Sequence, residues 1–298
     1  MSVSASVGWI GLGKLGLPMA ARLAASPHPV AGHDRDAGRM ALAAGRGVTE
    51  AATSEAAVAG KDIVFTSLPD DAALRAAVLG EGGIASLMKP GAILVETSTV
   101  SPAVSAELAE GCARAEIAYL RLPISGSSAL AETGSVTCFA SGPRSAFDAA
   151  LPVLQRFTRA QTYLGTGEEA RYAKLAVNLM IAVSAGMMAE ALALARKGNI
   201  GWTDMLGVLG ESAVASPFVK YKVGPLAERD FSPTFTSRQL VKDLDLILDA
   251  AAASHVPVPL AGVLRQTYSS LMATGEADND FIAVVRHVER LSGLGEPA

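Results

Sequence analysis

The sequence predicts an α/β protein in which an N-terminal Rossmann-type, doubly wound parallel sheet is followed by an all-α C-terminal domain. Three observations predict this fold class. Short apolar runs alternate with helical stretches up to about residue 164, a Gly-x-Gly-x-x-Gly turn follows the first run, and beyond residue 167 only helical periodicity continues. We therefore expect one domain over residues 1–164 and a second, helical domain over residues 165–298.

Six short apolar runs are the predicted strands. They cover residues 7–10, 30–33, 63–68, 93–96, 118–122 and 136–141. Apolar runs of this length that alternate with helical stretches are typical of βαβ units. We expect the six strands to pair in parallel, with helices on both faces of the sheet.

The helical half begins with one long predicted helix. Residues 170–197 are rich in Ala, Leu and Met, and at 1.5 Å per residue they would form a helix of about 40 Å that joins the two domains. Gly198 and Asn199 should end this helix, because both residue types tolerate the left-handed conformation found at helix C-termini.

Composition and charge exclude several kinds of partner. The formal net charge is -4 and the basic residues are dispersed, so we expect no nucleic-acid partner. The two cysteines and the four scattered histidines provide neither a disulfide framework nor a metal-ligand spacing, so we assign no metal. The most apolar stretch, residues 179–194, is shorter than the ~20 residues of a membrane span, and no signal segment precedes the first strand. We expect a cytoplasmic protein with no membrane partner.

A glycine-rich turn joins the first predicted strand to a helix. It comprises Gly11, Leu12, Gly13, Lys14, Leu15 and Gly16. Glycines at these three positions allow a tight turn, close backbone approach to a pyrophosphate and close packing of the helix, whose N-terminus then faces the phosphates. Asp34 ends the second strand, 18 positions after Gly16, near the ~20-residue offset of the acid that holds a ribose. We assign these residues to dinucleotide binding.

The residues after the second strand bear on the choice between NAD and NADP. Arg35 can accept the additional phosphate of NADP, whereas Asp34 and Asp36 would both repel it. We therefore favour NAD and leave NADP open. With NAD bound, Arg35 would pack over the adenine or face solvent.

Several segments, in order and over nearly the whole chain, carry a family resemblance. They are residues 11–20, 68–71, 96–102, 123–127, 165–167, 174–178 and 231–235 followed by 242–244. Together they resemble the β-hydroxyacid dehydrogenase family, which includes 3-hydroxyisobutyrate dehydrogenase and tartronate semialdehyde reductase. The resemblance implies an NAD(P)-dependent oxidoreductase for a small 3-hydroxy acid or its semialdehyde. It also implies an NAD(P)-binding first domain, a second domain for substrate binding and dimerisation, and a homodimer or homotetramer.

The resemblance also implies roles for individual residues. Those that would approach the nicotinamide half of the cofactor are Leu68, Pro69, Ser98, Thr99 and Lys242. The first four lie at the carboxyl ends of predicted strands, which agrees with ligand binding beyond the carboxyl ends of parallel strands. Phe231 would form a wall of the substrate pocket. Taken singly, Pro69 and Ser98 are equally explained as turn and cap residues, and Phe231 as core.

A loop for the substrate carboxylate is implied next. The family sequence reads Asp-Ala-Pro-Val-Ser-Gly-Gly, whereas this chain has Arg121-Leu-Pro-Ile-Ser-Gly-Ser127. Arg121 replaces the acid and Ser127 replaces the last glycine. Ser125, Gly126 and Ser127 would bind the carboxylate through backbone N–H groups and hydroxyls. The alternative is an ordinary polar turn.

Lys174 and Asn178 form the predicted catalytic pair. Four residues apart in an apolar helical stretch, they share one helix face. From spacing alone, a solvated lysine and a surface asparagine are the simpler interpretation. The resemblance implies that Lys174 is the general acid/base and that Asn178 positions the substrate. The family pattern is Lys-x-x-Asn-Asn, and Val177 stands at the first asparagine, so one polar contact is missing.

Two other functions stay open. An imine reductase would share this fold and cofactor, although such enzymes generally lack the lysine at position 174. A non-catalytic dinucleotide-binding protein is the other alternative, and the joint retention of Lys174, Asn178 and Lys242 argues against it. The sequence does not identify which hydroxy acid is the substrate.

Overall fold

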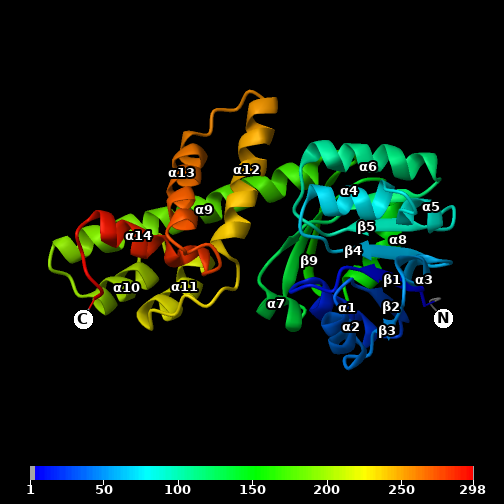
Figure 1. Cartoon of the computed structure of the whole chain (residues 1–298), viewed down its shortest axis with the longest axis horizontal. Coiled ribbons are helices and arrows are strands. Elements are labelled where there is room, and N and C mark those ends of the chain that lie inside the picture. The colour runs from blue at the N-terminus through cyan, green and yellow to red at the C-terminus, as the bar shows by residue number, and fades with distance from the viewer. Residues whose placement is uncertain (1–3, 298) are drawn as a thin grey trace. The chain divides into compact units, whose positions relative to one another are not determined.

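The computed structural model describes residues 4–297 and has the predicted fold class. The chain forms two compact units, one extending to Lys174 and the other beginning at Leu175. The first unit is built on a sheet with helices on both of its faces, and in the described part of the chain the second unit contains helices only (Figure 1).

A single sheet of nine strands organises the first unit within the described residues. The strands are β1 (Val7–Ile10), β2 (Val30–His33), β3 (Thr49–Glu50), β4 (Ile63–Thr66), β5 (Ile93–Glu96), β6 (Ala118–Arg121), β7 (Ile124–Ser125), β8 (Val136–Ser141) and β9 (Thr158–Gly165). Their order is β3-β2-β1-β4-β5-β6-β8-β7, with β9 paired to β8. The first six strands are parallel. They follow the Rossmann order, which reverses between β1 and β4 and so marks the expected ligand crevice.

Two hydrophobic cores lie on opposite faces of this sheet because side chains alternate along each strand. Trp9 and Phe65 point into one core, where their rings stack 4.6 Å apart. Ile10 and Val64, the adjacent positions, point into the other. The helices that cover the two faces are α1 (Gly16–Ala24), α2 (Ala37–Ala44), α3 (Ser54–Val58), α4 (Asp71–Leu79), α5 (Ile84–Leu87), α6 (Pro102–Arg114), α7 (Ser128–Glu132) and α8 (Arg144–Leu154).

The prediction of a wholly parallel sheet is wrong at β8, which pairs antiparallel with β6 and β7. The connection from β6 to β8 contains only the short strand β7 and the five-residue helix α7. A parallel pair normally needs a full crossover helix, and an antiparallel pair does not. The prediction also missed three strands. β3 and β7 have two residues each, and the edge strand β9 lacks a continuous apolar run.

The second unit is helical. After α9 (Glu169–Lys197), which starts in the first unit, come α10 (Trp202–Glu211), α11 (Pro217–Ala227), α12 (Ser237–Ala253), α13 (Pro259–Ala273), a short 3-10 helix (Phe281–Ala283) and α14 (Val284–Leu291). The long helix predicted for residues 170–197 is confirmed. Asn199, with φ of 61°, adopts the left-handed conformation at its end, and Gly198 does not.

Helix α9 corrects one sequence argument. We expected the apolar stretch to be too short to cross a membrane, yet α9 has 29 residues, and its most apolar 18-residue window has a mean hydropathy of 1.7. By length and composition alone it passes the test for a membrane span, as the core helix of a soluble protein also can. Residues of α9 from Leu175 to Leu192 contribute to the hydrophobic core of the second unit, and 44% of that window is buried.

Candidate cofactor and catalytic sites

The glycine-rich turn between β1 and α1 has the geometry of a dinucleotide loop. Gly11 has a φ of 91°, and a Cβ there would lie 2.3 Å from the carbonyl oxygen of Ser67. A Cβ at Gly16 would lie 2.1 Å from the carbonyl oxygen of Gly11. Neither position can accept another residue without moving the backbone. No side chain caps the N-terminus of α1, so the positive end of the helix dipole faces the turn and favours an anion such as a pyrophosphate.

Asp34 lies next to this turn, as predicted for the ribose-binding acid. Its Oδ2 accepts a hydrogen bond from the backbone N–H of Leu12 at 2.7 Å, and its Oδ1 accepts one from Asp36 at 2.9 Å. A carboxylate has about four acceptor positions, so it can hold the turn and still accept from ribose hydroxyls. Arg35 is exposed. Asp36 caps α2, accepting from the backbone N–H of Arg39.

Sequence reasoning missed Arg39. A Cβ on Gly13 would lie 2.7 Å from Nη1 of Arg39, so this guanidinium covers the middle of the glycine-rich turn. Arg39 also forms a half-exposed ion pair with Asp36 at 4.0 Å. The sequence did contain a signal for Arg39: it stands three residues after Asp36, a spacing that lets the two side chains meet on a helix.

The loops that follow β4 and β5 are tied to each other. The backbone N–H of Leu68 donates to Oγ of Ser98 at 2.8 Å, and the hydroxyls of Ser67 and Thr97 are 2.7 Å apart. Four of the residues predicted to approach the nicotinamide therefore lie in two adjacent loops at the carboxyl ends of adjacent strands. Among them Ser98 is buried and Pro69 is exposed.

The predicted carboxylate loop contains the short strand β7 and the start of α7. Ser125 ends β7, and Gly126 has a φ of 142°, a conformation that favours glycine. The hydroxyl of Ser127 caps α7 by accepting from the N–H of Leu130 at 3.4 Å. Ser127 therefore has a structural role, as the cap of α7, that sequence reasoning did not assign to it.

Arg121, which departs from the family pattern at the start of this loop, forms an ion pair with Glu168. Both side chains are largely buried. The positive charge is therefore balanced by a residue 47 positions later in the chain. This pairing explains how the fold accepts an arginine where the family has an acid.

Lys174 lies in the second turn of α9 and is 9% exposed. Asn178 follows one turn later and is also buried. The interpretation of these residues as a solvated lysine and a surface asparagine is therefore wrong. A buried lysine is uncommon because the side chain carries a charge or a strongly polar amine.

Asn178 belongs to a buried polar group in the second unit. Its Nδ2 donates to Oδ2 of Asp243 at 2.6 Å, and Oδ1 of the same carboxylate pairs with Nζ of Lys242 at 2.9 Å. Asp243 thus connects Asn178 and Lys242, two of the predicted site residues. Asp243 pairs locally with Lys242, whereas its contact with Asn178 spans 65 positions of the chain.

Phe231 lies in the core of the second unit with 5% of its surface exposed. The guanidinium of Arg286 stacks over its ring at 3.9 Å. This placement agrees with the alternative interpretation of Phe231 as a core aromatic residue.

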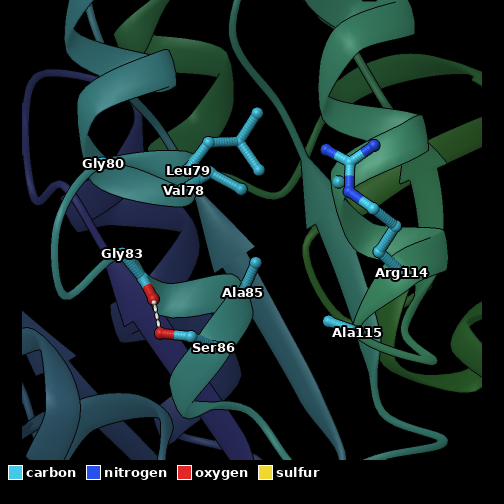
Figure 2. Close-up of a pocket in the computed structure, with 9 residues that line it drawn as sticks. Val78, Leu79, Gly80, Gly83, Ala85, Ser86, Arg114 and Ala115 are labelled. Carbon is cyan, nitrogen blue, oxygen red and sulfur yellow. Dashed lines mark hydrogen bonds between the residues drawn. The ribbon is translucent and has the colours of Figure 1, made fainter.

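A hollow of about 280 Å³ lies away from all these residues. It is bounded by the C-terminal ends of α4 and α6 and by α5 (Figure 2). Because α4 and α6 begin near the carboxyl ends of the strands, their C-terminal ends lie at the opposite edge of the sheet. The hollow therefore contains none of the predicted site residues.

Comparison with known proteins agrees with this arrangement. Residues 6–165 match the family model of the NAD binding domain of 6-phosphogluconate dehydrogenase. Residues 167–288 match the model described as NAD-binding of NADP-dependent 3-hydroxyisobutyrate dehydrogenase. The 2-(hydroxymethyl)glutarate dehydrogenase of Eubacterium barkeri is 29% identical over 295 residues, covering 99% of this chain and 98% of that protein.

Solved structures give the same picture. The 3-hydroxyisobutyrate dehydrogenase of Mycobacterium tuberculosis, determined with L-serine, has a TM-score of 0.87 and 26% identity, covering 96% of this chain and 99% of its own. An imine reductase from Pseudomonas sp. is more distant, with a TM-score of 0.63 and 18% identity over 95% of this chain and 99% of its own. The second likeness shows the fold alone.

Proposed function

Because this chain belongs to the β-hydroxyacid dehydrogenase family of NAD(P)-dependent oxidoreductases, we propose that it transfers a hydride between NAD and a small 3-hydroxy acid or its semialdehyde. The observation that carries the proposal is the buried Lys174, one helical turn from the buried Asn178. A lysine and an asparagine on one helix face can act on the same hydroxyl group.

The fit of the cofactor rests on the glycine-rich turn and on Asp34. The turn leaves no room for side chains at Gly11 and Gly16, which is what close approach of a pyrophosphate needs. Asp34 favours a free ribose hydroxyl over a phosphate, so we propose NAD as the preferred cofactor. NADP is the alternative cofactor, because Arg35 and Arg39 lie shortly after β2 and a guanidinium there could bind the additional phosphate.

The substrate class follows from two relatives. One is named for 2-(hydroxymethyl)glutarate, and another was determined with L-serine. Both compounds carry a carboxylate and a CH₂OH group on the same carbon. We propose that this chain acts on 3-hydroxypropanoates substituted at C2. Ser125 and Gly126 would bind the carboxylate through a hydroxyl and backbone N–H groups.

The nicotinamide supplies the hydride acceptor or donor. During oxidation, neutral Lys174 takes the proton of the substrate hydroxyl, and during reduction its ammonium returns that proton to the new alkoxide oxygen. Asn178 would hold the same hydroxyl, because the hydrogen bond from its Nδ2 to Asp243 keeps the amide in one orientation.

We further propose a functional boundary between residues 164 and 165 and a cytoplasmic homodimer or homotetramer. Support for an oligomer comes from α9, where the exposed side chains of Met180, Met187 and Leu194 recur every seven residues along one face. An exposed apolar row of this kind is typical of an interface. Light scattering after size-exclusion chromatography measures the oligomeric state directly.

A substrate panel tests the proposed function. The protein is incubated with NAD or NADP and a series of 3-hydroxy acids, and NAD(P)H formation is followed by absorbance. Turnover of a C2-substituted 3-hydroxypropanoate supports the proposal. Turnover of a cyclic imine alone would indicate an imine reductase, and NADH binding with no turnover of any compound would indicate a non-catalytic dinucleotide-binding protein.

A further inference from the structure

A group of buried polar side chains connects the cofactor loops of the first unit to the start of α9. We call it the Arg171 network. Its members are Glu96, Ser105, Tyr119, Arg121, Glu168 and Arg171. It contains two arginines and two glutamates, so the formal charges balance.

Arg171 makes most of the contacts. It is 1% exposed and forms an ion pair with Glu96, which is fully buried. Its Nε donates to Oγ of Ser105 at 3.1 Å, and its Nη2 donates to the hydroxyl of Tyr119 at 3.0 Å. Burial alone would lower the pKa of Arg171, but Glu96 and Tyr119 raise it, so the guanidinium stays charged. Burial raises the pKa of Tyr119 to about 12, which keeps its hydroxyl protonated.

Ser105 joins the two halves of the network. Its Oγ also accepts from Nε of Arg121 at 3.0 Å, and Arg121 pairs with Glu168 just before α9. Both arginines therefore donate a hydrogen bond to Ser105 of α6, and each forms an ion pair with a glutamate. The end of β6, where the carboxylate loop starts, is held to the same point as the first turn of α9.

The network also reaches the cofactor loops. Nη1 of Arg171 donates to the carbonyl oxygen of Ser98 at 2.9 Å, and the N–H of Ser98 donates to Oε1 of Glu96 at 2.5 Å. Ser98 in turn accepts from the N–H of Leu68. Arg171 thus holds both backbone polar groups of Ser98, one directly and one through Glu96. Lys174 follows Arg171 by three residues, about one helical turn.

A role limited to stability does not account well for this arrangement. Removing two charges from water is costly, and an apolar pair of similar volume is often as stable as a buried ion pair or more so. The guanidinium of Arg171 donates directional hydrogen bonds to four different partners, and one of them is the backbone carbonyl of Ser98 in a proposed cofactor loop. Such contacts set orientation more than they add stability.

We propose that Arg171 is a positioning residue that fixes the first turn of α9, and with it Lys174, against the loop containing Ser98. This inference rests on the proposed role of Lys174. A displacement of about 1 Å at a reacting group can reduce the rate by about 10²-fold, so loss of the network should lower kcat much more than cofactor affinity.

The test compares a single variant with a charge-balanced double variant. Arg171→Met leaves Glu96 buried without its partner, so its melting temperature should fall. Glu96→Gln combined with Arg171→Met removes both charges and should melt close to the wild type. If Arg171 positions Lys174, the double variant keeps a kcat at least about tenfold below wild type and shows a larger primary deuterium isotope effect, because hydride transfer has become slower. If the double variant regains wild-type kcat together with stability, the network is only structural and the proposal is wrong.

A second variant and a matched control complete the test. Arg171→Lys keeps the charge, but one ammonium cannot replace the four-partner geometry of the guanidinium, so kcat should still fall about tenfold, and an unchanged kcat would overturn the proposal. Arg75→Met with Glu107→Gln removes an exposed ion pair between α4 and α6 and should leave kcat unchanged.

A measurement without turnover separates this proposal from the proposed function. Hydrogen exchange followed by mass spectrometry should be faster in the double variant in peptides covering residues 96–101 and 168–176, and unchanged in a peptide covering β2. This result would support the tether even if no hydroxy acid were oxidised. Unchanged exchange in both peptides would contradict the proposal.

Discussion

The side-chain amide of Asn178 donates to the carboxylate of Asp243, with Nδ2 and Oδ2 only 2.6 Å apart in the interior of the second unit. Asp243 is 1% exposed, and its other oxygen pairs with Lys242. A buried carboxylate in this position fixes which end of the Asn178 amide faces away from it. The orientation of the proposed substrate-holding residue is therefore set by a residue that would not itself touch the substrate.

Replacing Asp243 should affect the substrate more than the cofactor. Asp243→Asn keeps the shape but removes the charge and makes the Asn178 amide free to turn, so KM for the hydroxy acid should rise about tenfold. NADH affinity, measured by fluorescence, should stay within about twofold. Asp245→Asn, on the same helix but in a surface pair with Arg265, is the control. An unchanged KM in Asp243→Asn would remove Asp243 from the site.

The two serines of the carboxylate loop should differ. Ser125→Ala should mainly raise KM, because it removes a proposed contact to the carboxylate. Ser127→Ala removes the cap of α7 and should cost about 0.5–2 kcal/mol of stability. Steady-state kinetics and thermal melts of both variants distinguish these effects. A Ser125→Ala enzyme with unchanged KM and reduced kcat would place that hydroxyl in transition-state stabilisation, and no change at all would exclude it from the site.

Cofactor preference should depend on Asp34. The wild type should use NAD with a higher kcat/KM than NADP, because the carboxylate repels an additional phosphate. Asp34→Ser should shift the ratio toward NADP by at least about tenfold, with Arg35 and Arg39 left to hold the phosphate. The ratio is measured with one substrate under identical conditions. A wild-type preference for NADP of tenfold or more would show that the arginines outweigh Asp34.

Both cysteines should be inert in the folded protein. Burial raises the pKa of Cys112 and of Cys138 to about 12, and both are free thiols. The reactive thiolate is therefore scarce at pH 8, and access is blocked as well. A colorimetric thiol reagent should titrate no cysteine in native protein and two after denaturation. Cys138 lies in one hydrophobic core of the first unit and Cys112 in the other, so rapid modification of the native protein would show that one of these cores opens readily.

The strands that could be predicted from sequence read as short apolar runs, and they are β1, β2, β4, β5, β6 and β8. The clearest are β1, β4 and β5, which are central in the sheet and buried along their whole length. β9 lies at an edge with alternate residues exposed, so its polar sequence gave no such signal. The antiparallel pairing of β8 is set by a short connection whose fold is not visible in local periodicity.

The candidate site shows the same division. The glycine-rich turn, Asp34 and the spacing of Lys174 and Asn178 are local patterns, and these were available from the sequence. The partner of Arg121 lies 47 positions away and the partner of Asn178 lies 65 positions away, so tertiary structure alone brings them together. One signal was present but unused. A charged residue at the end of an apolar strand, such as Arg121 or Glu96, requires a buried partner.

The role of Lys174 is the central claim, and Lys174→Ala tests it most directly. Losing proton transfer should lower kcat by about 10²–10⁴ in both directions. NADH binding should hardly change, because the cofactor is held mainly by the glycine-rich turn and Asp34. Lys197→Ala, an exposed lysine at the other end of α9, is the control and should keep wild-type kinetics.

The deciding measurement is therefore kcat of Lys174→Ala for oxidation and reduction, made on protein whose NADH binding has been verified by fluorescence. We predict normal NADH binding with kcat reduced by at least about a hundredfold. A variant that binds NADH normally and retains more than about a tenth of wild-type kcat would contradict the assignment and leave Lys242 as the next candidate for the general acid/base.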